Sequence, residues 1–383
     1  MKDAPNILVM VESSRESGRK LISGIADYAR HFGPWRFHWE PQGLKGLTGA
    51  MGELRFDGVL ARNVADLSAY ADEGIPTVAF TYGMNDIANS VTVDTDDAGI
   101  AKMVATHFLQ RGFKNFAYCG QEGALWAARR GRHFEEVLAV AGFEVVQLVA
   151  PSSLAGARAT RADLETTARW LRSLPTPVLL MAANDDLAQS LVQLCLDCGL
   201  RVPDDCALIG VDNDPVICGL CNPPLSSVSV NQYKAGYRAA EILAGMIRGE
   251  TPERWTVTAE VVELVERQSS DIIAVEDKAV AKALRFIRSN ADRPLSVDEV
   301  AKSSGVHRRS LERRFREHLS LTVQQYCRET RAEHVAKVLT GSSLSLEEIA
   351  WQCAFPQASH LTRFFSTVRG ETPSAYRKRC TNA

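Results

Sequence analysis

The chain has 383 residues, of which 45% are hydrophobic and 23% charged, as in an ordinary globular protein. This length is too great for one small core and predicts two or three domains. No apolar run approaches the ~18 residues of a membrane-spanning helix, and the run at residues 7–11 is too short for a secretory signal, so we expect a cytoplasmic protein. The net charge of −2 hides an asymmetry, since from Asp277 onward 19 basic residues stand against 11 acidic ones. A basic C-terminal part on an acidic body predicts that only this part meets a polyanion, and a solvated charged surface is the alternative.

Short apolar segments alternate with amphipathic ones through the first 270 residues. We predict strands at residues 7–11, 58–61, 77–80, 115–119, 145–149, 178–182, 207–211 and 256–262. Between them we predict helices at residues 18–32, 96–111, 126–141, 185–198 and 234–248. This alternation is typical of parallel sheets covered by helices on both faces, and the number of units indicates two lobes. We therefore expect an α/β domain in residues 1–270 and, where only helical patterns follow, an all-α domain in residues 275–383.

Polar side chains follow several of the predicted strands. They include Ser13, Arg62, Trp126, Arg130, Asn184 and Asp212. Ligands of open α/β sheets bind beyond the carboxyl ends of the strands, and this mixture of carboxylate, amide, guanidinium and indole groups suits a polyhydroxylated ligand. Helix capping explains any one Asp or Asn after a strand, but the repeated pattern favours a sugar pocket. The sequence offers no glycine-rich phosphate loop and no nucleophile with a partner base, so we expect neither an enzyme nor a cofactor.

The cysteines contain a spacing that resembles a zinc site. Cys195 and Cys198 form one Cys-x-x-Cys pair, and Cys218 and Cys221 form another. The first pair ends the predicted helix at residues 185–198, which is ~20 Å long, and the chain returns through a strand before the second pair. Because one tetrahedral ion cannot reach both pairs, we expect no metal and interpret the thiols as small, buried, apolar groups.

Six segments resemble ligand sensors of the LacI/periplasmic-binding-protein type, most closely the branch found in xylose-operon regulators. They are NILVMVESSRESGRKLISGIADYAR, FDGVLARN, VDTDDAGIAKMVATHFLQRGFKNFAYCG, AANDDLAQSL, CGLRVPDDCALIGVDND and PPLSSVSVNQYKAGYRAAEIL. The resemblance implies a two-lobed sensor whose sugar is held by an aspartate, an amide, an arginine and an aromatic wall, here Asp212, Asn184, Arg130 and Trp126. Many sugar-binding relatives carry Gln in the SSVxQ segment, where this chain has Val230 followed by Asn231. Asn231 is therefore only a weak substitute at that sugar hydroxyl.

The pattern after Ser270 is helical, with an amphipathic opening helix predicted at residues 280–290. Two capping boxes then start helices, SVDE at residues 296–299 and SLEE at residues 345–348. Each first helix is followed by a turn and a second helix, and we expect the second turn to be one residue longer than the first. A helix, a short turn and a helix form the helix-turn-helix unit, which this chain carries twice.

Both second helices carry the phrase Leu-x-Arg-x-Phe, at residues 311–315 and 361–365. Its Leu and Phe are an i, i+4 pair that we expect to face the core. The arginine between them, Arg313 or Arg363, then points away, on the face that a recognition helix offers to bases. An arginine fork pairs with guanine O6 and N7, which favours a DNA-binding role over a merely solvated helix face. The first copy adds Arg308, Arg309, Arg314 and Arg316, which we expect near phosphates or, for Arg316, in solvent.

The tail SLSLEEIAWQCAFPQASHLTRFFSTVRGETPSAYRKR resembles the AraC/XylS-type DNA-binding domain, and the likeness covers the whole C-terminal module. Ala354 and Ser366 depart from that family's pattern, which usually has Gly in the turn and a basic residue after Phe. For Glu312, a hydrogen bond from cytosine N4 and a helical salt bridge to Arg308 or Arg316 are equally good interpretations. The resemblance implies that the base readers are Arg309, Glu312, Arg313, Ser359, Thr362 and Arg363, with Arg308 beside them.

We therefore predict a sugar-responsive, DNA-binding transcription regulator that activates genes for pentose catabolism. Its expected partners are double-stranded DNA at promoter half-sites, a pentose effector with D-xylose as the first choice, a second copy of the chain, and RNA polymerase. Two alternatives stay open. One is the same architecture sensing another sugar, and the other is a ligand-independent DNA-binding regulator whose sensor domain only dimerises.

Overall fold

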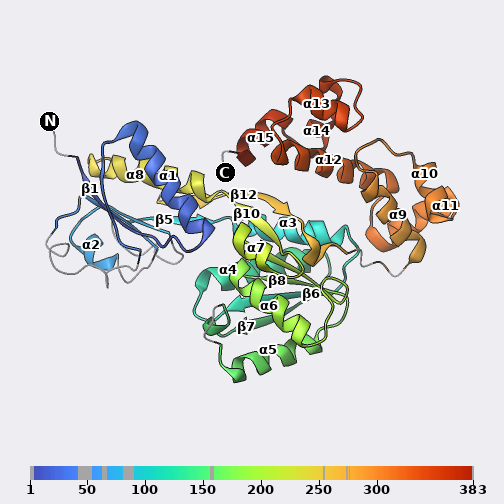
Figure 1. Cartoon of the computed structure of the whole chain (residues 1–383), viewed down its shortest axis with the longest axis horizontal. Coiled ribbons are helices and arrows are strands. Elements are labelled where there is room, and N and C mark those ends of the chain that lie inside the picture. Colours follow the sequence, from blue (N-terminus) through green and yellow to red (C-terminus); the bar gives the residue numbers. More distant parts are fainter. Residues whose placement is uncertain are drawn as a thin grey trace.

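The structure, a computed structural model, describes residues 4–41, 54–62, 67–80, 90–155, 159–252, 255–272, 275 and 277–381. Figure 1 shows two α/β lobes and a helical C-terminal part that lies against the second lobe. The predicted fold class, a two-lobed α/β part followed by an all-α part, is confirmed. Among the residues described, no helix combines the length and the apolar character that crossing a membrane requires.

The first lobe contains a six-stranded sheet with the order β11-β5-β4-β3-β1-β2, in which all neighbours are parallel. Its strands are β1 (Asn6–Met10), β2 (Arg36–Trp39), β3 (Gly58–Ala61), β4 (Thr77–Ala79), β5 (Ser90–Thr95) and β11 (Thr256–Ala259). Its helices are α1 (Glu16–Phe32), α2 (Ser68–Asp72) and α8 (Gln232–Ile247). Helices α1 and α8 pack closely because Gly24 lacks a side chain, and a Cβ there would lie 2.1 Å from the carbonyl oxygen of Tyr233.

The second lobe contains a six-stranded sheet with the order β12-β10-β9-β8-β6-β7, parallel except for the antiparallel pair β10 and β12. Its strands are β6 (Phe116–Gln121), β7 (Val145–Ala150), β8 (Val178–Ala182), β9 (Cys206–Val211), β10 (Ser226–Val230) and β12 (Val261–Val265). Its helices are α3 (Asp97–Leu109), α4 (Leu125–Val140), α5 (Arg161–Ser173), α6 (Asp185–Asp197) and α7 (Pro215–Leu220). The central strands β8 and β9 are buried along their whole length, as expected for parallel strands covered on both faces.

Three crossovers between the lobes lie side by side. The N–H of Asp96 donates to the carbonyl oxygen of Ala259 at 3.0 Å, and the N–H of Asn231 donates to the carbonyl oxygen of Glu260 at 2.9 Å. The single strand predicted at residues 256–262 is wrong, because the chain changes sheet at Glu260. β11 ends before this residue in the first sheet, and β12 begins after it in the second.

The C-terminal part has two small hydrophobic cores, one for each helix-turn-helix unit. Its helices are α9 (Lys278–Ser289), α10 (Val297–Ser304), α11 (Arg308–Leu319), α12 (Val323–Gly341), α13 (Leu346–Gln352), α14 (Ala358–Arg369) and α15 (Pro373–Thr381). The long helix α12 packs its first half into one core and its second half into the other. Both capping boxes are formed as predicted. The connecting segments are residues 305–307 and 353–357, so the second is two residues longer and not one.

Candidate functional site

Several polar contacts join the two lobes at the carboxyl ends of their strands, a region we call the lobe junction. Arg15 precedes α1 and pairs with Asp186 of α6, with Arg15 Nε 2.9 Å from Asp186 Oδ2. The N–H of Glu16 donates to Asp214 Oδ2 at 2.8 Å, so a carboxylate of the second lobe caps the first turn of α1. Asp214 is buried and also accepts from the N–H of Val216 at the start of α7. Side chains of both lobes therefore hold the lobe junction together.

Asp212 follows β9 at the lobe junction, and its φ of 109° lies outside the range that L-residues usually adopt. Burial raises the pKa of its carboxyl to about 6, and the guanidinium groups of Arg130 and Arg62 act in the opposite direction. Arg62 belongs to the first lobe, where its NH1 donates to Glu12 Oε1 at 2.7 Å. Arg62 of the first lobe and Arg130 of the second lobe are thus close enough to Asp212 for their charges to act on it. An unusual backbone conformation beside perturbed charged groups is typical of binding sites.

Arg130 of α4 is buried and is oriented by a carboxylate that the sequence did not single out. Its Nε donates to Asp97 Oδ1 at 2.9 Å, and its NH1 donates to the carbonyl oxygen of Ala183. Its guanidinium lies 5.2 Å from the ring centroid of Trp126, so the predicted arginine and the predicted aromatic wall are stacked. Asp97, the first residue of α3, also accepts from Arg129 Nε at 3.1 Å. Helix α3 therefore begins at the lobe junction.

The two predicted amide ligands cap helices. Asn184 Oδ1 accepts from a backbone N–H of α6 at 3.0 Å, and Asn231 Oδ1 accepts from a backbone N–H of α8 at 2.9 Å. Capping therefore explains both amide oxygens, and the Nδ2 groups are the donors that a ligand would use. The carbonyl oxygen of Ser13 accepts a hydrogen bond from Arg19 NH1 at 2.9 Å.

Asp185, the first residue of α6, is a second buried carboxylate close to Asp212. It accepts from the hydroxyl of Ser227 at 2.5 Å and from the N–H of Asp214 at 2.8 Å. Burial, reinforced by the charge of Asp212, raises the pKa of Asp185 well above its ordinary value. A carboxyl group that stays protonated adds no second negative charge beside Asp212.

The two Cys-x-x-Cys pairs lie at different helices, Cys195 and Cys198 at the end of α6 and Cys218 and Cys221 at α7. Cys218 Sγ lies 3.6 Å from Asp185 Oδ2, at the first turn of the helix. Cys195 lies ten residues further along the same helix, a distance of ~15 Å at the rise of an α-helix, and is buried beside Cys206. The predicted separation of the pairs is confirmed.

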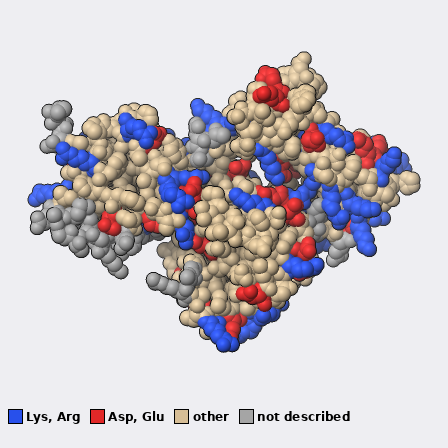
Figure 2. All heavy atoms as spheres, in the orientation of Figure 1, with Lys and Arg blue, Asp and Glu red and all other residues tan. Residues whose placement is uncertain are grey.

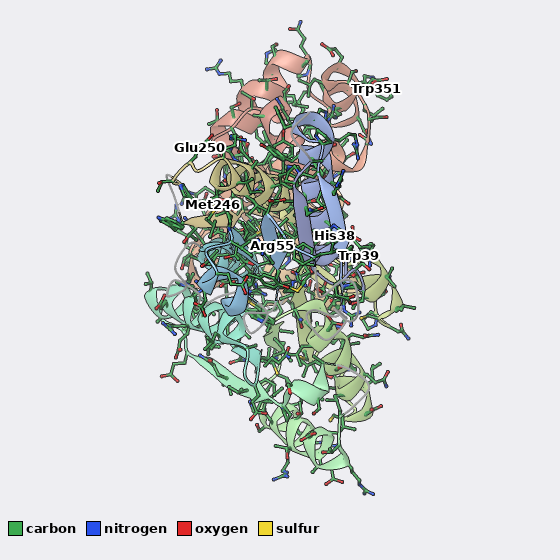
Figure 3. The ribbon with its side chains drawn as sticks, turned by 90° about the vertical axis from the view of Figure 1, so that its left-hand side faces the viewer. His38, Trp39, Arg55, Met246, Glu250 and Trp351 are labelled. Atoms are coloured by element: carbon green, nitrogen blue, oxygen red, sulfur yellow. The ribbon has the colours of Figure 1, made fainter. Side chains whose placement is uncertain are left out.

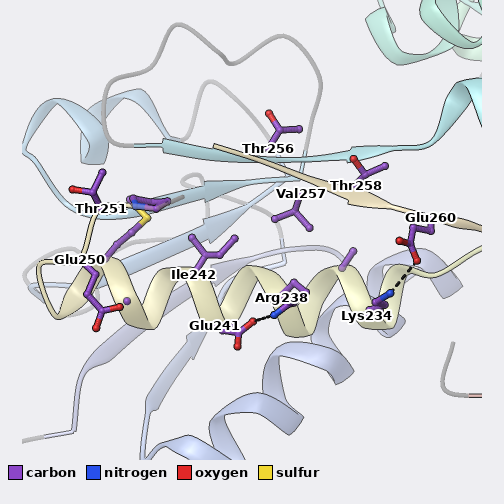
Figure 4. A pocket seen from close by; sticks show the side chains of 14 residues that line it. Lys234, Arg238, Glu241, Ile242, Glu250, Thr251, Thr256, Val257, Thr258 and Glu260 are labelled. Carbon is purple, nitrogen blue, oxygen red and sulfur yellow. Dashed lines mark hydrogen bonds and ion pairs between the residues drawn. The ribbon is translucent and has the colours of Figure 1, made fainter. Parts of the chain in front are cut away.

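A groove of about 670 Å³ lies away from the lobe junction, between α8 and β11 (Figure 4). Its charged groups all have partners, and Glu250 pairs with Arg248 beside the groove. Lys234 Nζ lies 2.9 Å from Glu260 Oε2, and Arg238 NH1 donates to Glu241. Because these charges already have partners, we do not assign a ligand to the groove.

The two second helices of the helix-turn-helix units have the predicted orientation. The Leu and Phe side chains of both Leu-x-Arg-x-Phe phrases are buried, whereas Arg313 and Arg363 are exposed. Figure 2 shows Lys and Arg gathered at the right-hand end of the molecule, where α11 lies in Figure 1. The face of α11 that carries Arg309 and Glu312 is therefore part of a basic surface.

The arginines of the first unit are partly engaged by carboxylates. Arg308 NH1 lies 3.2 Å from Asp298 Oδ2, and Arg313 NH1 lies 2.6 Å from Glu317 Oε1. Glu312 is half-buried, and its Oε2 has no hydrogen-bond partner. The salt bridge proposed from Glu312 to its neighbouring arginines is therefore not formed within the described part of the chain.

The second unit offers a different surface. Ser359 and Arg363 of α14 are exposed, and Thr362 between them is half-buried. Ala354, in the turn before α14, has a φ of 53°, the conformation for which glycine is usually chosen. Trp351 of α13 is 84% exposed and projects from the C-terminal part (Figure 3).

Two family models match the chain. Residues 105–270 match a periplasmic binding protein-like domain, and residues 300–379 match a helix-turn-helix domain. Relatives cover almost the whole chain. The xylose operon regulatory protein of Escherichia coli (strain K12) is 25% identical over 384 residues, which are 97% of this chain and 96% of that protein. The protein of the same name from Haemophilus influenzae (strain ATCC 51907 / DSM 11121 / KW20 / Rd) is 24% identical over 388 residues, 98% of each chain.

Solved structures agree with this arrangement. The structure of the xylose-binding transcription activator XylR matches with a TM-score of 0.61 at 24% identity and covers 98% of each chain. The transcriptional regulator CelR in complex with cellobiose matches with a TM-score of 0.57 at 20% identity, over 69% of this chain and 84% of that one. These likenesses show the fold, and the relatives are transcription regulators rather than enzymes.

Proposed function

We propose that this chain, a transcription regulator in which a periplasmic-binding-protein-like sensor precedes a helix-turn-helix DNA-binding domain, binds a pentose between its lobes and activates genes for pentose use. D-xylose is the first candidate, because the full-length relatives are named for xylose. The observation that carries the proposal is the lobe junction itself, where Arg130 is oriented by Asp97 and stacked on Trp126, and where its charge and that of Arg62 act on Asp212. It is not an enzyme, and its activity would consist of coupling sugar binding to DNA binding in the cytoplasm.

Each part of the lobe junction has a role in this proposal. The ionised carboxylate of Asp212 accepts from two neighbouring hydroxyls, and Arg130, held by Asp97, donates to a sugar oxygen. The indole of Trp126 packs against the C–H face of the ring. The remaining polar groups come from both lobes, so a sugar that touches all of them favours the closed form. These groups are those of Ser13, Arg62, Asn184 and Asn231.

The DNA-binding part of the proposal concerns a homodimer. Two chains would bind paired half-sites, each through α11 and α14, and a closed sensor would set the spacing of the two DNA-binding domains. The proposed base contacts are those of Arg309, Glu312, Arg313, Ser359, Thr362 and Arg363, with Arg308 near the phosphates. An activator of this kind would also contact RNA polymerase.

Isothermal titration of the full-length protein with D-xylose tests the sugar site. We expect Asp212→Ala to weaken binding by at least ~10-fold, since a carboxylate that accepts two hydroxyls is worth more than ~1.4 kcal/mol. Asp204→Ala, in a carboxylate that is more than half exposed, is the control and should bind like the parent protein. Loss of a surface contact changes affinity by no more than about twofold. An affinity of Asp212→Ala for D-xylose within that range of the parent value would therefore refute the assignment.

The pKa of Asp212 gives the same experiment a pH dependence. Because burial raises this pKa to about 6, the carboxyl is protonated below that pH and loses its capacity to accept two hydrogen bonds. Sugar affinity should therefore fall by roughly tenfold between pH 7 and pH 5 in the parent protein, as follows from a single group titrating near pH 6. The Asp212→Asn variant cannot titrate, and its affinity should be flat over this range.

The second candidate is a regulator whose sensor binds no sugar and serves only to dimerise. A thermal-shift screen with pentoses and hexoses separates the two, because a ligand that binds only the folded protein raises the melting temperature. A shift with another sugar alone would replace D-xylose as the effector. No shift with any sugar would favour the second candidate.

A further inference from the structure

The sensor and the DNA-binding part meet around Glu266, which follows β12. Arg111 NH2 lies 2.7 Å from both of its carboxylate oxygens. Arg288 NH2 of α9 lies 3.0 Å from Oε1, and Lys337 Nζ of α12 lies 3.3 Å from Oε2. Only 7% of the Glu266 side chain and 5% of the Arg111 side chain are exposed. We call these four residues the Glu266 cluster.

The three cationic side chains of the Glu266 cluster stabilise the ionised form of the Glu266 carboxylate. Burial alone would raise the pKa of Glu266, but Arg111, Arg288 and Lys337 outweigh it and hold that pKa below its ordinary value. One carboxylate thus ties Arg111, just beyond the end of α3, to two helices of the DNA-binding part. Breaking such a buried pair by removing one partner leaves uncompensated charge and is strongly unfavourable.

A further hydrogen bond joins the end of α3 to α12, from Gln110 Nε2 to Glu329 Oε2 at 2.5 Å. His107 Nδ1 lies nearby, 3.9 Å from Glu333 Oε1, but burial lowers the pKa of His107, so this neighbour is uncharged. Glu329, Glu333 and Lys337 recur every four residues and therefore lie on one face of α12. Since α12 packs into the cores of both helix-turn-helix units, this face sets the position of both units relative to the sensor.

Helix α3 connects these contacts to the lobe junction. Its first residue, Asp97, pairs with Arg129 and Arg130, and its last turn and the two residues after it reach the DNA-binding part. A helix of 13 residues is ~20 Å long and shifts as one rigid rod. A displacement of Asp97 at one end of α3 would therefore move its last turn and, directly after it, the turn that carries Gln110 and Arg111.

We propose that α3 is the element through which occupancy of the lobe junction reaches the DNA-binding part, and that Glu266 locks that part onto the sensor. The first half of this inference rests on the proposed function, whereas the lock does not. Coupling of this kind requires that a ligand favour one arrangement of two rigid parts over another. A buried carboxylate that is shared by three elements holds these parts in one arrangement, so any change of arrangement must move or break this contact.

A bound cation is the alternative for this cluster. His107, Glu266 and Glu333 place donor atoms within 4.8 Å of one another, as a metal site would. However, Glu266 is already engaged by three cationic side chains, so a further cation would lie among like charges. The arrangement fits an ion-pair lock better than a metal site.

Hydrogen exchange of the full-length protein without ligand tests the lock. We expect the amides of α9 and α12 to exchange roughly tenfold faster in Glu266→Gln, with the first turn of α3 unchanged. Lys337→Gln removes a side chain that is 50% exposed, so it should fold normally and give a smaller increase in the same amides. Glu260→Gln is the control, since this carboxylate is exposed and pairs with Lys234 across the surface. Unchanged exchange in both cluster variants overturns the lock.

The connection to the ligand is tested by measuring DNA affinity with and without D-xylose. The DNA is a labelled fragment that the parent protein selects from a random-sequence library. Addition of D-xylose should change the DNA affinity of the parent protein, and in Glu266→Gln the ratio of affinities with and without D-xylose should fall to about one. The affinity of Glu266→Gln for D-xylose should stay within about twofold of the parent value, because the residue lies outside the lobe junction. A ratio equal to that of the parent protein overturns the role of α3. A parent protein that binds no sugar overturns that role together with the proposed function. Hydrogen exchange tests the lock independently of sugar binding.

Discussion

The two helix-turn-helix units are built alike but present different chemistry to DNA. In both, a capping box starts the first helix, and the Leu/Phe pair of the second helix is buried. In the first unit α11 carries five arginines, three of which pair with carboxylates, whereas in the second unit α14 carries only Arg363 and Arg369. The buried pair and the cap therefore determine the fold of each unit, and the charge on the outer face is free to differ between them.

We expect the strongest loss of DNA binding from a substitution in the sparser unit. Arg363→Ala should weaken binding to the selected promoter fragment by ~1–3 kcal/mol, the discrimination of one good base contact, and should relax specificity at one base pair. The measurement is a fluorescence anisotropy titration with the promoter fragment and with a scrambled fragment at several salt concentrations. Equal weakening on both fragments, with the salt slope reduced by about one, would mean that Arg363 contacts a phosphate instead.

The matching substitution in the first unit, Arg313→Ala, tests whether the arginine-rich unit depends less on its central arginine. Arg313→Ala should weaken specific binding less than Arg363→Ala, because Arg313 must first leave Glu317 and other arginines remain on its face. Arg316→Ala is the control and should leave the affinity within about twofold, as for a solvated side chain. A larger loss for Arg313→Ala would make the first unit the main reader.

The turns of the two units predict opposite effects of exchanging Gly and Ala. Gly305 has a φ of 76° and Ala354 a φ of 53°, both in the left-handed region. Gly305→Ala should destabilise α10 by about 1 kcal/mol, while Ala354→Gly should stabilise α13 by about 0.5 kcal/mol after the larger entropy of glycine in the unfolded chain is counted. A Cβ on Gly305 would meet no atom within 4 Å, so the first effect is strain alone. Native-state hydrogen exchange of α10 and α13 measures both, and effects of the same sign would contradict the prediction.

Most elements of the sensor were predicted because apolar strands and amphipathic helices leave a local pattern, but three strands were missed. Ser226 and Ser227 of β10 are buried in the sheet, and their hydroxyls pair with the carbonyl oxygen of Arg267 and the carboxylate of Asp185. A strand that buries serines shows no apolar run. β2 is an edge strand with mostly exposed side chains, and β5 (Ser90–Thr95) contains only two apolar residues, Val91 and Val93, so it shows no apolar run.

The candidate site was predicted only in part. The rule that ligands bind at strand ends, together with the family resemblance, indicated Asp212, Arg130 and Arg62, and the charges of both arginines act on the carboxyl of Asp212. Asp97 was missed because it reads locally as a helix start, while its partner Arg130 lies 33 positions away. Long-range pairs of this kind, like those of Glu266, depend on tertiary packing and leave no spacing in the sequence.

The capping boxes offer a test in which the two units should behave alike. Ser296→Ala and Ser345→Ala should each destabilise the first helix of their unit by about 1 kcal/mol at neutral pH. Hydrogen bonds from the Ser residues hold the pKa of Glu299 and of Glu348 below the ordinary value. A carboxyl whose folded pKa is lowered stabilises the fold above its unfolded pKa, and this contribution is lost as the pH falls through the folded value. Hydrogen exchange of α10 and α13 should therefore show the effect of each substitution shrinking below about pH 4.

The weakest of these effects concerns a contact that only the first unit has. Arg314 NH1 lies 2.9 Å from Asp277 Oδ2, which joins α11 to the start of α9. Arg314→Gln should destabilise the first unit by about 0.5 kcal/mol at neutral pH, as for a partly exposed ion pair, and should leave the second unit unchanged. Burial opposes the charge of Asp277, but two backbone N–H groups and Arg314 hold its pKa below the ordinary value, so the effect should fade as the pH drops below about 4. Urea unfolding followed by hydrogen exchange of α11 measures it, with Arg316→Gln as the control. An effect of Arg314→Gln that persists in acid, or that appears equally in α14, would show that packing rather than charge connects α11 to α9.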